Sequence, residues 1–147
     1  VAHTTSIELT IPEQKFPVHI DESAFRQTIL NLTVNARDAM GPEGRIQITL
    51  RPVEAGDEMS CIESNRIGPA PTKGVVLDFA DTGLGIHPDI LGKIFQPFFS
   101  TKEKGKGSGF GLYNARIFAS NHGGKIGVTS IPNQGTTFHI YLPVLEG

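Results

Sequence analysis

The stretch Val75–Ile86, VVLDFADTGLGI, combines a strand with a sharp turn. Its first six residues are nearly all apolar and include Val, Leu and Phe, which is typical of a central strand. Asp81 follows this run, and Gly83 and Gly85 come two and four residues later. Glycine permits a tight turn and a close approach to the main chain. We therefore predict a strand that ends in one carboxylate, beside a turn on which a flat group can lie.

The carboxylate of Asp81 can only accept hydrogen bonds, so it needs a donor if it is buried. An exocyclic amino group, such as that of adenine, is one suitable donor. Asp-Thr-Gly is also an ordinary sequence for a strand that runs into a turn. The motif by itself leaves both interpretations open.

The composition indicates one globular domain, residues 1–147, without a strong overall charge. The chain is 38% hydrophobic and 19% charged, and its formal net charge is −2. This excludes a global positive field for nucleic acid, so any anion site must be local. The single cysteine, Cys61, cannot form an internal disulfide, and we expect it to act as a small apolar residue.

No apolar run approaches the roughly 18 residues needed to cross a bilayer, and the N-terminus lacks a signal-peptide pattern. We therefore expect a soluble, cytoplasmic chain. It starts at Val1 without an initiator Met, which either processing or excision from a longer protein explains. An excised piece is compatible with a membrane-anchored parent protein.

The first forty residues predict two strands and a helix. Alternation around Ile7 and Leu9 indicates the first strand, and Pro17–Ile20 the second. Asp21 is a candidate N-cap for a helix over about Glu22–Met40, which a Gly-Pro pair ends.

This predicted helix has an apolar face and an unusual polar face. Helical spacing relates the apolar residues of the expected core stripe, which are Phe25, Ile29, Leu32, Ala36 and Met40. Asn31, Asn35 and Asp38 recur at the same spacing on another face. Asparagine competes with the helix for hydrogen bonds, and a solvated face would normally carry Glu, Lys or Gln. A functional face and a merely solvated face both remain possible from the helix alone.

The rest of the chain predicts further strands and helices around an aromatic cluster. A polar loop over residues 56–72 is expected to be a hairpin connection, and Ile94–Phe99 forms the aromatic cluster. The remaining predicted elements are strands Arg45–Arg51, Val75–Ala80, Lys125–Ser130 and Thr136–Leu142, a short helix from His87, and a helix from Ser108 to Asn121. This order predicts an α+β, two-layer sandwich, with helices on one face of a mixed, mostly antiparallel sheet.

A glycine-rich loop before the last predicted helix indicates an anion site. Gly107, Gly109 and Gly111 lead into that helix, and unpaired N–H groups at a helix N-terminus attract anions. Lysines at 102, 104 and 106 supply positive charge in a segment that cannot pack itself. Phosphate is the expected ligand, although neither the P-loop motif nor the dinucleotide fingerprint is present.

A phosphate ligand would be accompanied by a divalent cation. Mg²⁺ prefers oxygen ligands, and Asn35 offers a neutral carbonyl oxygen. The five histidines have no paired metal-binding spacing, so a zinc site is not expected.

Five motifs then occur in one order, and together they resemble a known family. They are Asn31–Ala39, Asp81–Ile86, Ile94–Phe99, Gly107–Leu112 and Gly135–Phe138. They are similar to the N, G1, F, G2 and G3 boxes of the catalytic ATP-binding domain of two-component sensor histidine kinases. The resemblance covers roughly residues 21–143 and implies the Bergerat fold of the GHKL superfamily, which also includes gyrase, mismatch-repair and heat-shock chaperone ATPases.

The resemblance implies a role for each motif. Asp81 would bind the adenine amino group, Asn35 would ligate Mg²⁺, and Asn31 would help to hold the metal-phosphate unit. Thr137 would close the adenine pocket, and Lys102 would contact phosphate. The implied catalytic residues are Asn31, Asn35 and Lys102. The implied nucleotide-binding residues are Asn31, Asn35, Asp81, Gly83, Gly85, Ile86, Lys102, Gly107, Ser108, Gly109, Gly111, Leu112 and Thr137.

Two positions depart from the family pattern. Many of these kinases have Lys where this chain has Asp38, so Arg37 or a lysine of the glycine-rich segment would have to replace that phosphate contact. Phe110 stands where Leu is usual. Hydrolytic relatives carry a general-base Glu at the position of Asn31, so fast ATP hydrolysis is not expected.

The resemblance implies that the chain binds Mg·ATP and donates the γ-phosphate to a histidine on a separate dimerisation domain. The expected cofactors are ATP and Mg²⁺, and a response regulator is the expected downstream partner. The isolated domain is expected to be monomeric and the intact kinase a homodimer, without nucleic acid. Two alternatives are an anti-sigma-factor-type serine kinase, which the aromatic cluster disfavours, and a regulatory module with a degenerate nucleotide site.

Overall fold

The computed structural model describes residues 4–41, 43–58, 69–97 and 111–145. Five strands form one sheet in the order β1-β2-β3-β5-β4. They are β1 (Thr4–Thr10), β2 (Glu43–Val53), β3 (Gly74–Asp81), β4 (Lys125–Ile131) and β5 (Gly135–Pro143). The helices are α1 (Glu22–Met40), α2 (Pro88–Leu91) and α3 (Gly111–Asn121).

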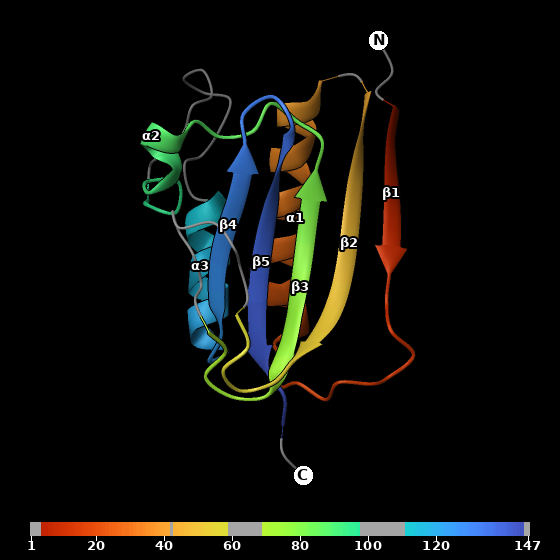
Figure 1. Ribbon diagram of the computed structural model, residues 1–147, viewed down its shortest axis with the longest axis vertical. Coiled ribbons are helices and arrows are strands. Elements are labelled where there is room, and N and C mark those ends of the chain that lie inside the picture. The colour runs from red at the N-terminus through yellow and green to blue at the C-terminus, as the bar shows by residue number, and fades with distance from the viewer. Residues whose placement is uncertain (1–3, 42, 59–68, 98–110, 146–147) are drawn as a thin grey trace.

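The architecture confirms the predicted α+β sandwich. β1 pairs with β2 in parallel, whereas β2–β3, β3–β5 and β4–β5 are antiparallel. In Figure 1 helices α1 and α3 both lie behind the sheet, so its front face carries no helix in the described part of the chain. The strand predicted to be central, β3, is the third of the five.

The two faces of the sheet have separate apolar clusters. Phe79 of β3 and Phe138 of β5 face the helices and pack in the main core with Leu32 of α1. Val76 and Tyr141 face the other way and form a smaller cluster. Because strand side chains alternate between faces, odd positions of β3 and even positions of β5 face the helices.

The caps and the apolar core stripe predicted for helix α1 are confirmed. The side chain of Asp21 accepts a hydrogen bond from the Ala24 N–H at 3.2 Å, and Gly41 ends the helix with a φ of 76°. In the stripe, Leu32 and Ala36 are buried, and the other three residues pack partly buried against the core. Of the predicted aromatic cluster, Ile94 and Phe95 are buried, while residues 98–99 lie outside the described residues.

The strand predicted at Pro17–Ile20 is wrong. Residues 11–20 have no strand pairing, although Phe16, Val18 and Ile20 pack against the core. The carbonyl oxygen of Pro17 accepts a hydrogen bond from Leu145 N–H at 2.8 Å. The apolar alternation therefore reflects a connecting segment whose apolar side chains pack on the core without strand pairing.

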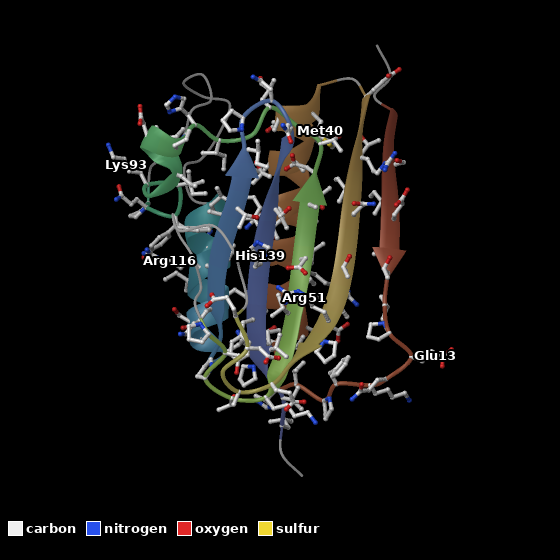
Figure 2. All side chains as sticks on the ribbon, in the orientation of Figure 1. Glu13, Met40, Arg51, Lys93, Arg116 and His139 are labelled. Carbon is white, nitrogen blue, oxygen red and sulfur yellow. The ribbon has the colours of Figure 1, made fainter. Side chains whose placement is uncertain are left out.

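The helix-free face carries a row of polar side chains from four adjacent strands. Arg51 of β2 donates to Asp78 of β3 at 2.7 Å, and Asp78 is also bonded to Nδ1 of His139 on β5. The other ring nitrogen of His139 is 3.0 Å from the hydroxyl of Thr129 on β4. Figure 2 shows Arg51 and His139 over the middle of the sheet. Both ring nitrogens of the buried His139 thus have hydrogen-bond partners, as expected of a histidine with a structural role.

Burial of Asp78 raises its pKa, but the hydrogen bonds from His139 and Arg51 and the charge of Arg51 outweigh that effect. The net pKa of Asp78 lies below its ordinary value. None of the helices in the described residues is both long and apolar enough to span a membrane.

We predict that Leu32→Ala destabilises the protein by about 2–5 kcal/mol, because Leu32 is 0% exposed and truncation leaves a cavity in the core. Leu30, two residues earlier on the same helix, is 53% exposed, so Leu30→Ala is the matched control. Urea denaturation measures the free energy of unfolding of both variants. An equal loss of stability in the two variants would show that α1 packs on the sheet through a different face.

Candidate functional site

The site is built around Asp81, the last residue of β3. Its side chain lies on the helix-covered side of the sheet and the residue is only 7% exposed. One carboxylate oxygen accepts a hydrogen bond from the Gly83 N–H at 2.8 Å. Burial raises the pKa of Asp81 above its ordinary value, and the backbone N–H groups of Gly83 and Thr136 offset only part of this effect. A buried acceptor is thus placed at the end of the central strand.

The loop after Asp81 is held on two sides by backbone hydrogen bonds. Leu84 N–H donates to the carbonyl of Ala39, at the end of α1, at 3.2 Å. From the other side, the turn between β4 and β5 contributes Asn133 N–H, which donates to the carbonyl of Leu84 at 2.6 Å. The loop is therefore clamped between α1 and the β4–β5 turn.

The two glycines of this loop have a role that differs in part from the predicted one. A Cβ on Gly83 would lie 2.9 Å from Cβ of Ala39, and a Cβ on Gly85 would collide with the carbonyl of Ile131. Gly85 also has a φ of 75°, which side chains rarely adopt. We expected these glycines to leave room for a planar ring. Instead, the protein's own backbone and α1 fill that room, so the glycines shape the site by letting the loop pack.

The threonine beside Asp81 is Thr136, not Thr137. Thr136 is the cross-strand partner of Asp81, is 5% exposed and lies on the same sheet face. Thr137 pairs with Ala80 and lies on the helix-free face. The structure therefore does not bring Thr137 together with Asp81. The signal that could have separated the two residues is Phe138, because a core position there places Thr136 on the core side.

Ser130 is a second residue near Asp81 that the sequence did not reveal. Its hydroxyl oxygen accepts from Ile86 N–H at 2.7 Å and lies 3.0 Å from the hydroxyl of Thr136. Ile86, which the family resemblance placed in the site, is thereby fixed through its main chain, and its side chain packs on the core. A serine in a strand carries no motif, so only the fold could show this contact.

The two asparagines of α1 lie along one row that leads to the loop. Asn31, Asn35 and Ala39 are spaced by four residues, which places them on one helix face, and Ala39 contacts Gly83. Asn31 donates to the carbonyl of Gly111 at 3.4 Å and accepts from Gln27 at 3.0 Å. Asn35 is half-buried, and its side chain has no hydrogen-bond partner among the described residues. Its amide is therefore available to a ligand.

Helix α3 brings its first residue to this row. A Cβ built on Gly111 would lie 3.8 Å from Cβ of Asn31, so α3 begins beside the middle of α1. Leu112 follows and packs on the core. Of the other predicted phosphate contacts, Lys102, Gly107, Ser108 and Gly109 all lie outside the described residues.

The residues present fit a Mg²⁺ ion only together with a phosphate ligand. The described residues contain no group of three or more His, Cys, Asp or Glu side chains that could hold a metal alone. Mg²⁺ commonly takes one or two protein oxygens and completes its shell with substrate phosphates and water. The unpartnered amide of Asn35 is one such oxygen.

We predict that Asp81 titrates at a higher pH than Asp78, although both lie on β3. Asp78 is stabilised in its charged form and Asp81 in its neutral form. Asp78 therefore contributes stability that is present above the unfolded pKa of about 3.9 and is lost as the pH falls through its lower folded value. Asp81 does the opposite: stability falls as the pH rises from about 3.9 through its raised folded pKa.

Carbon-detected NMR titration of the two carboxyl groups measures this order directly. The reverse order for Asp78 and Asp81 would contradict the burial and bonding described above.

Comparison with known proteins places this site in a family. Residues 20–146 match the model of the histidine kinase-, DNA gyrase B- and HSP90-like ATPases. The sensor kinase CckA of Brucella abortus is 43% identical over 95% of this chain, and the sensor histidine kinase ZraS of Salmonella typhimurium is 34% identical over 95%. The chain spans only 15% and 26% of these two relatives.

Solved structures of sensor kinases have the same fold. The mycobacterial sensor histidine kinase MprB is 26% identical, with a TM-score of 0.73, over 97% of this chain and 84% of that one. Full-length ShkA in complex with AMPPNP is 26% identical, with a TM-score of 0.71, over 97% of this chain and 26% of that one. The chain therefore belongs to the family of histidine kinase-, DNA gyrase B- and HSP90-like ATPases, as a catalytic domain of the sensor histidine kinase type.

Proposed function

We propose that this domain binds Mg·ATP and donates the γ-phosphate to a histidine on a separate helical dimerisation domain. The observation that carries the proposal is the buried carboxylate of Asp81, whose following loop packs at Gly83 against Ala39, at the end of the asparagine row on α1. A carboxylate can accept more than the hydrogen bonds that Gly83 and Thr136 supply, so it can also take a donor from a ligand. The amino group of adenine supplies one.

The base end of the site is preformed. Gly83 N–H holds one carboxylate oxygen of Asp81 in place, and Thr136 lies directly across the strand pair. The loop that carries Gly83 is clamped on both sides. A base bound there would meet fixed hydrogen-bonding groups that need no rearrangement, which lowers the cost of binding.

The phosphate end is formed by α1 and the start of α3. Asn35 would hold Mg²⁺ through its amide oxygen, and Asn31 ties this position to Gly111. When bound, Mg²⁺ neutralises charge on the phosphates, and phosphoryl transfer depends mainly on such positioning and neutralisation. The contacts expected from Lys102, Gly107, Ser108 and Gly109 belong to the same proposal.

The groups around the phosphate end do not favour hydrolysis. Asn31 stands where a general base would be needed, and an amide cannot take a proton from water at neutral pH. Its side chain is also engaged with Gln27 and Gly111. The phosphoryl group would therefore pass to an external acceptor rather than to water.

Several histidines of the chain are poor acceptor candidates. His87 accepts from Asp89 N–H as a helix cap, and His122 is bonded to Asp21 N–H and to the Phe118 carbonyl. His139 is buried in the polar row on the other sheet face. The acceptor is therefore proposed to lie in another domain of a homodimeric kinase, and a response regulator to receive the phosphoryl group afterwards.

Neither alternative function is favoured. The relatives compared above are named sensor kinases, which disfavours an anti-sigma-factor-type serine kinase. A degenerate nucleotide site would be expected to lose its buried carboxylate or its unpartnered amide. Both Asp81 and Asn35 are present, so a purely regulatory module is disfavoured as well.

We predict that Asp81→Asn weakens binding of adenine nucleotides by about 100-fold or more, because a charged acceptor for the amino group is lost. Isothermal titration with Mg·AMPPNP measures the loss. Asp78→Asn is the matched control, since it changes an aspartate on the opposite face of the same strand. It is expected to lower stability but to keep affinity, and unchanged affinity in Asp81→Asn would refute the assigned contact.

We predict that Asn35→Ala weakens nucleotide binding only in the presence of Mg²⁺, by about 10-fold, because it removes one metal ligand while leaving the base end intact. Titrations with AMPPNP in Mg²⁺ and in EDTA provide the comparison. Asn121→Ala, at the far end of α3, is the control. An equal loss in EDTA would place the metal elsewhere.

A further inference from the structure

We propose that Ser130 of β4 is a positioning residue that fixes the hydroxyl of Thr136 as an acceptor and thereby makes the site select a purine with an amino group. This inference rests on the proposed function. It concerns a residue that is not among the proposed ligand contacts and that acts on the base through Thr136.

The hydroxyl of Ser130 has three hydrogen-bond partners. It donates to the carbonyl of Gly135 at 3.0 Å and accepts from Ile86 N–H at 2.7 Å. It also lies 3.0 Å from the hydroxyl of Thr136, where either oxygen could donate. These partners come from the loop after β3 and from the start of β5, so Ser130 joins the two segments that flank Asp81.

A count of protons decides the direction of the third bond. A serine hydroxyl has one proton and two lone pairs. We assign this proton to the Gly135 carbonyl, which has no proton of its own and can pair with Ser130 only as an acceptor. One lone pair accepts from Ile86 N–H. The remaining lone pair can only accept, so the hydroxyl of Thr136 must be the donor in its bond to Ser130.

This direction determines what Thr136 can offer to a ligand. Once its single proton is given to Ser130, only the lone pairs of its oxygen remain. Thr136 is the cross-strand partner of Asp81, whose carboxylate is also an acceptor. Both polar side chains at this end of the sheet therefore require N–H or O–H donors from the ligand.

The chemistry of the purine base then follows. The 6-amino group of adenine offers two N–H donors, whereas the 6-oxo group of hypoxanthine offers only lone pairs. If the 6-oxo group faced the acceptors of Asp81 and Thr136, these buried polar groups would be left unpaired. This costs more free energy than the loss of a single hydrogen bond. Ser130 thus supports the choice of ATP over ITP.

The surroundings give the arrangement little freedom to relax. Gly135 has a φ of 140°, and a Cβ there would collide with the carbonyl of Asp81. Thr136 is buried, so water cannot easily replace Ser130 as its partner. Removal of the Ser130 hydroxyl would free the proton of Thr136 to turn toward the ligand, where it could donate to a 6-oxo group.

The test measures the ratio of dissociation constants for Mg·ITP and Mg·ATP, by titration of the full chain. We expect the wild-type chain to prefer ATP, and Ser130→Ala to reduce this preference by about 3- to 10-fold, as the loss of one oriented hydrogen bond implies. Thr129→Ala is the matched control: it removes a hydroxyl from the neighbouring position of β4, on the opposite face, where it bonds His139. It should keep the wild-type ratio.

Thr136→Val provides a second route in case Ser130→Ala does not fold. It should reduce the preference as well, and the double variant Ser130→Ala/Thr136→Val should have the same ratio as Thr136→Val alone, because Ser130 acts through Thr136. Ser130→Thr keeps the hydroxyl and should preserve the preference.

The outcomes separate this inference from the proposed function. A wild-type chain that binds no ATP would refute the proposed function itself. A wild-type chain that prefers ATP, with an unchanged ratio in Ser130→Ala or in Thr136→Val, would overturn the role of Ser130, even if the variants melt at a lower temperature. A lower melting temperature alone is what a merely structural serine would produce.

Discussion

A single buried carboxylate constrains the architecture of the site. Asp81 is removed from water at the end of β3, where a charge is costly unless neighbouring groups satisfy it. Backbone N–H groups of Gly83 and Thr136 meet part of that need. For Gly83 to reach back to the carboxylate, the chain must turn at once, and the turn must pack against α1. Only glycine fits against Ala39 in that position.

The two ends of the site are held in different ways. The base end is defined by the main chain, through the loop clamped between α1 and the β4–β5 turn. The phosphate end depends on side chains of α1, of which Asn31 is engaged by Gly111 and Asn35 is unpartnered among the described residues. In the proposed nucleotide complex, the base would meet preformed groups, whereas the metal-phosphate unit would be completed by the ligand itself.

The opposite face of the sheet is electrostatically separate from the site. Asp78 and Asp81 lie three residues apart on β3, yet their side chains point to opposite faces. Arg51 and His139 satisfy Asp78 and lower its pKa, whereas burial raises the pKa of Asp81. The same strand thus carries one carboxyl group with a lowered pKa on one face and one with a raised pKa on the other.

Much of the fold was predictable because local chemistry and burial agree. Asp21 caps α1 as a short polar side chain should, and the apolar run of β3 belongs to a central strand. Pro17–Ile20 was predicted wrongly, since alternation alone cannot tell a paired strand from a segment that packs on the core. In the site, the family resemblance points to Thr137, whereas the strand register places Thr136 opposite Asp81, because a sequence motif does not state which face a strand residue occupies. Ser130 depends on contacts between distant segments, and no local pattern announces it.

The most direct measurement is a crystal structure of this chain grown with AMPPNP and Mg²⁺. The exocyclic nitrogen of adenine is predicted to lie within hydrogen-bonding distance of the Asp81 carboxylate, with Mg²⁺ next to the side-chain oxygen of Asn35. A nucleotide bound elsewhere, or a base whose amino group faces away from Asp81, would contradict the central claim that this buried carboxylate is the purine contact.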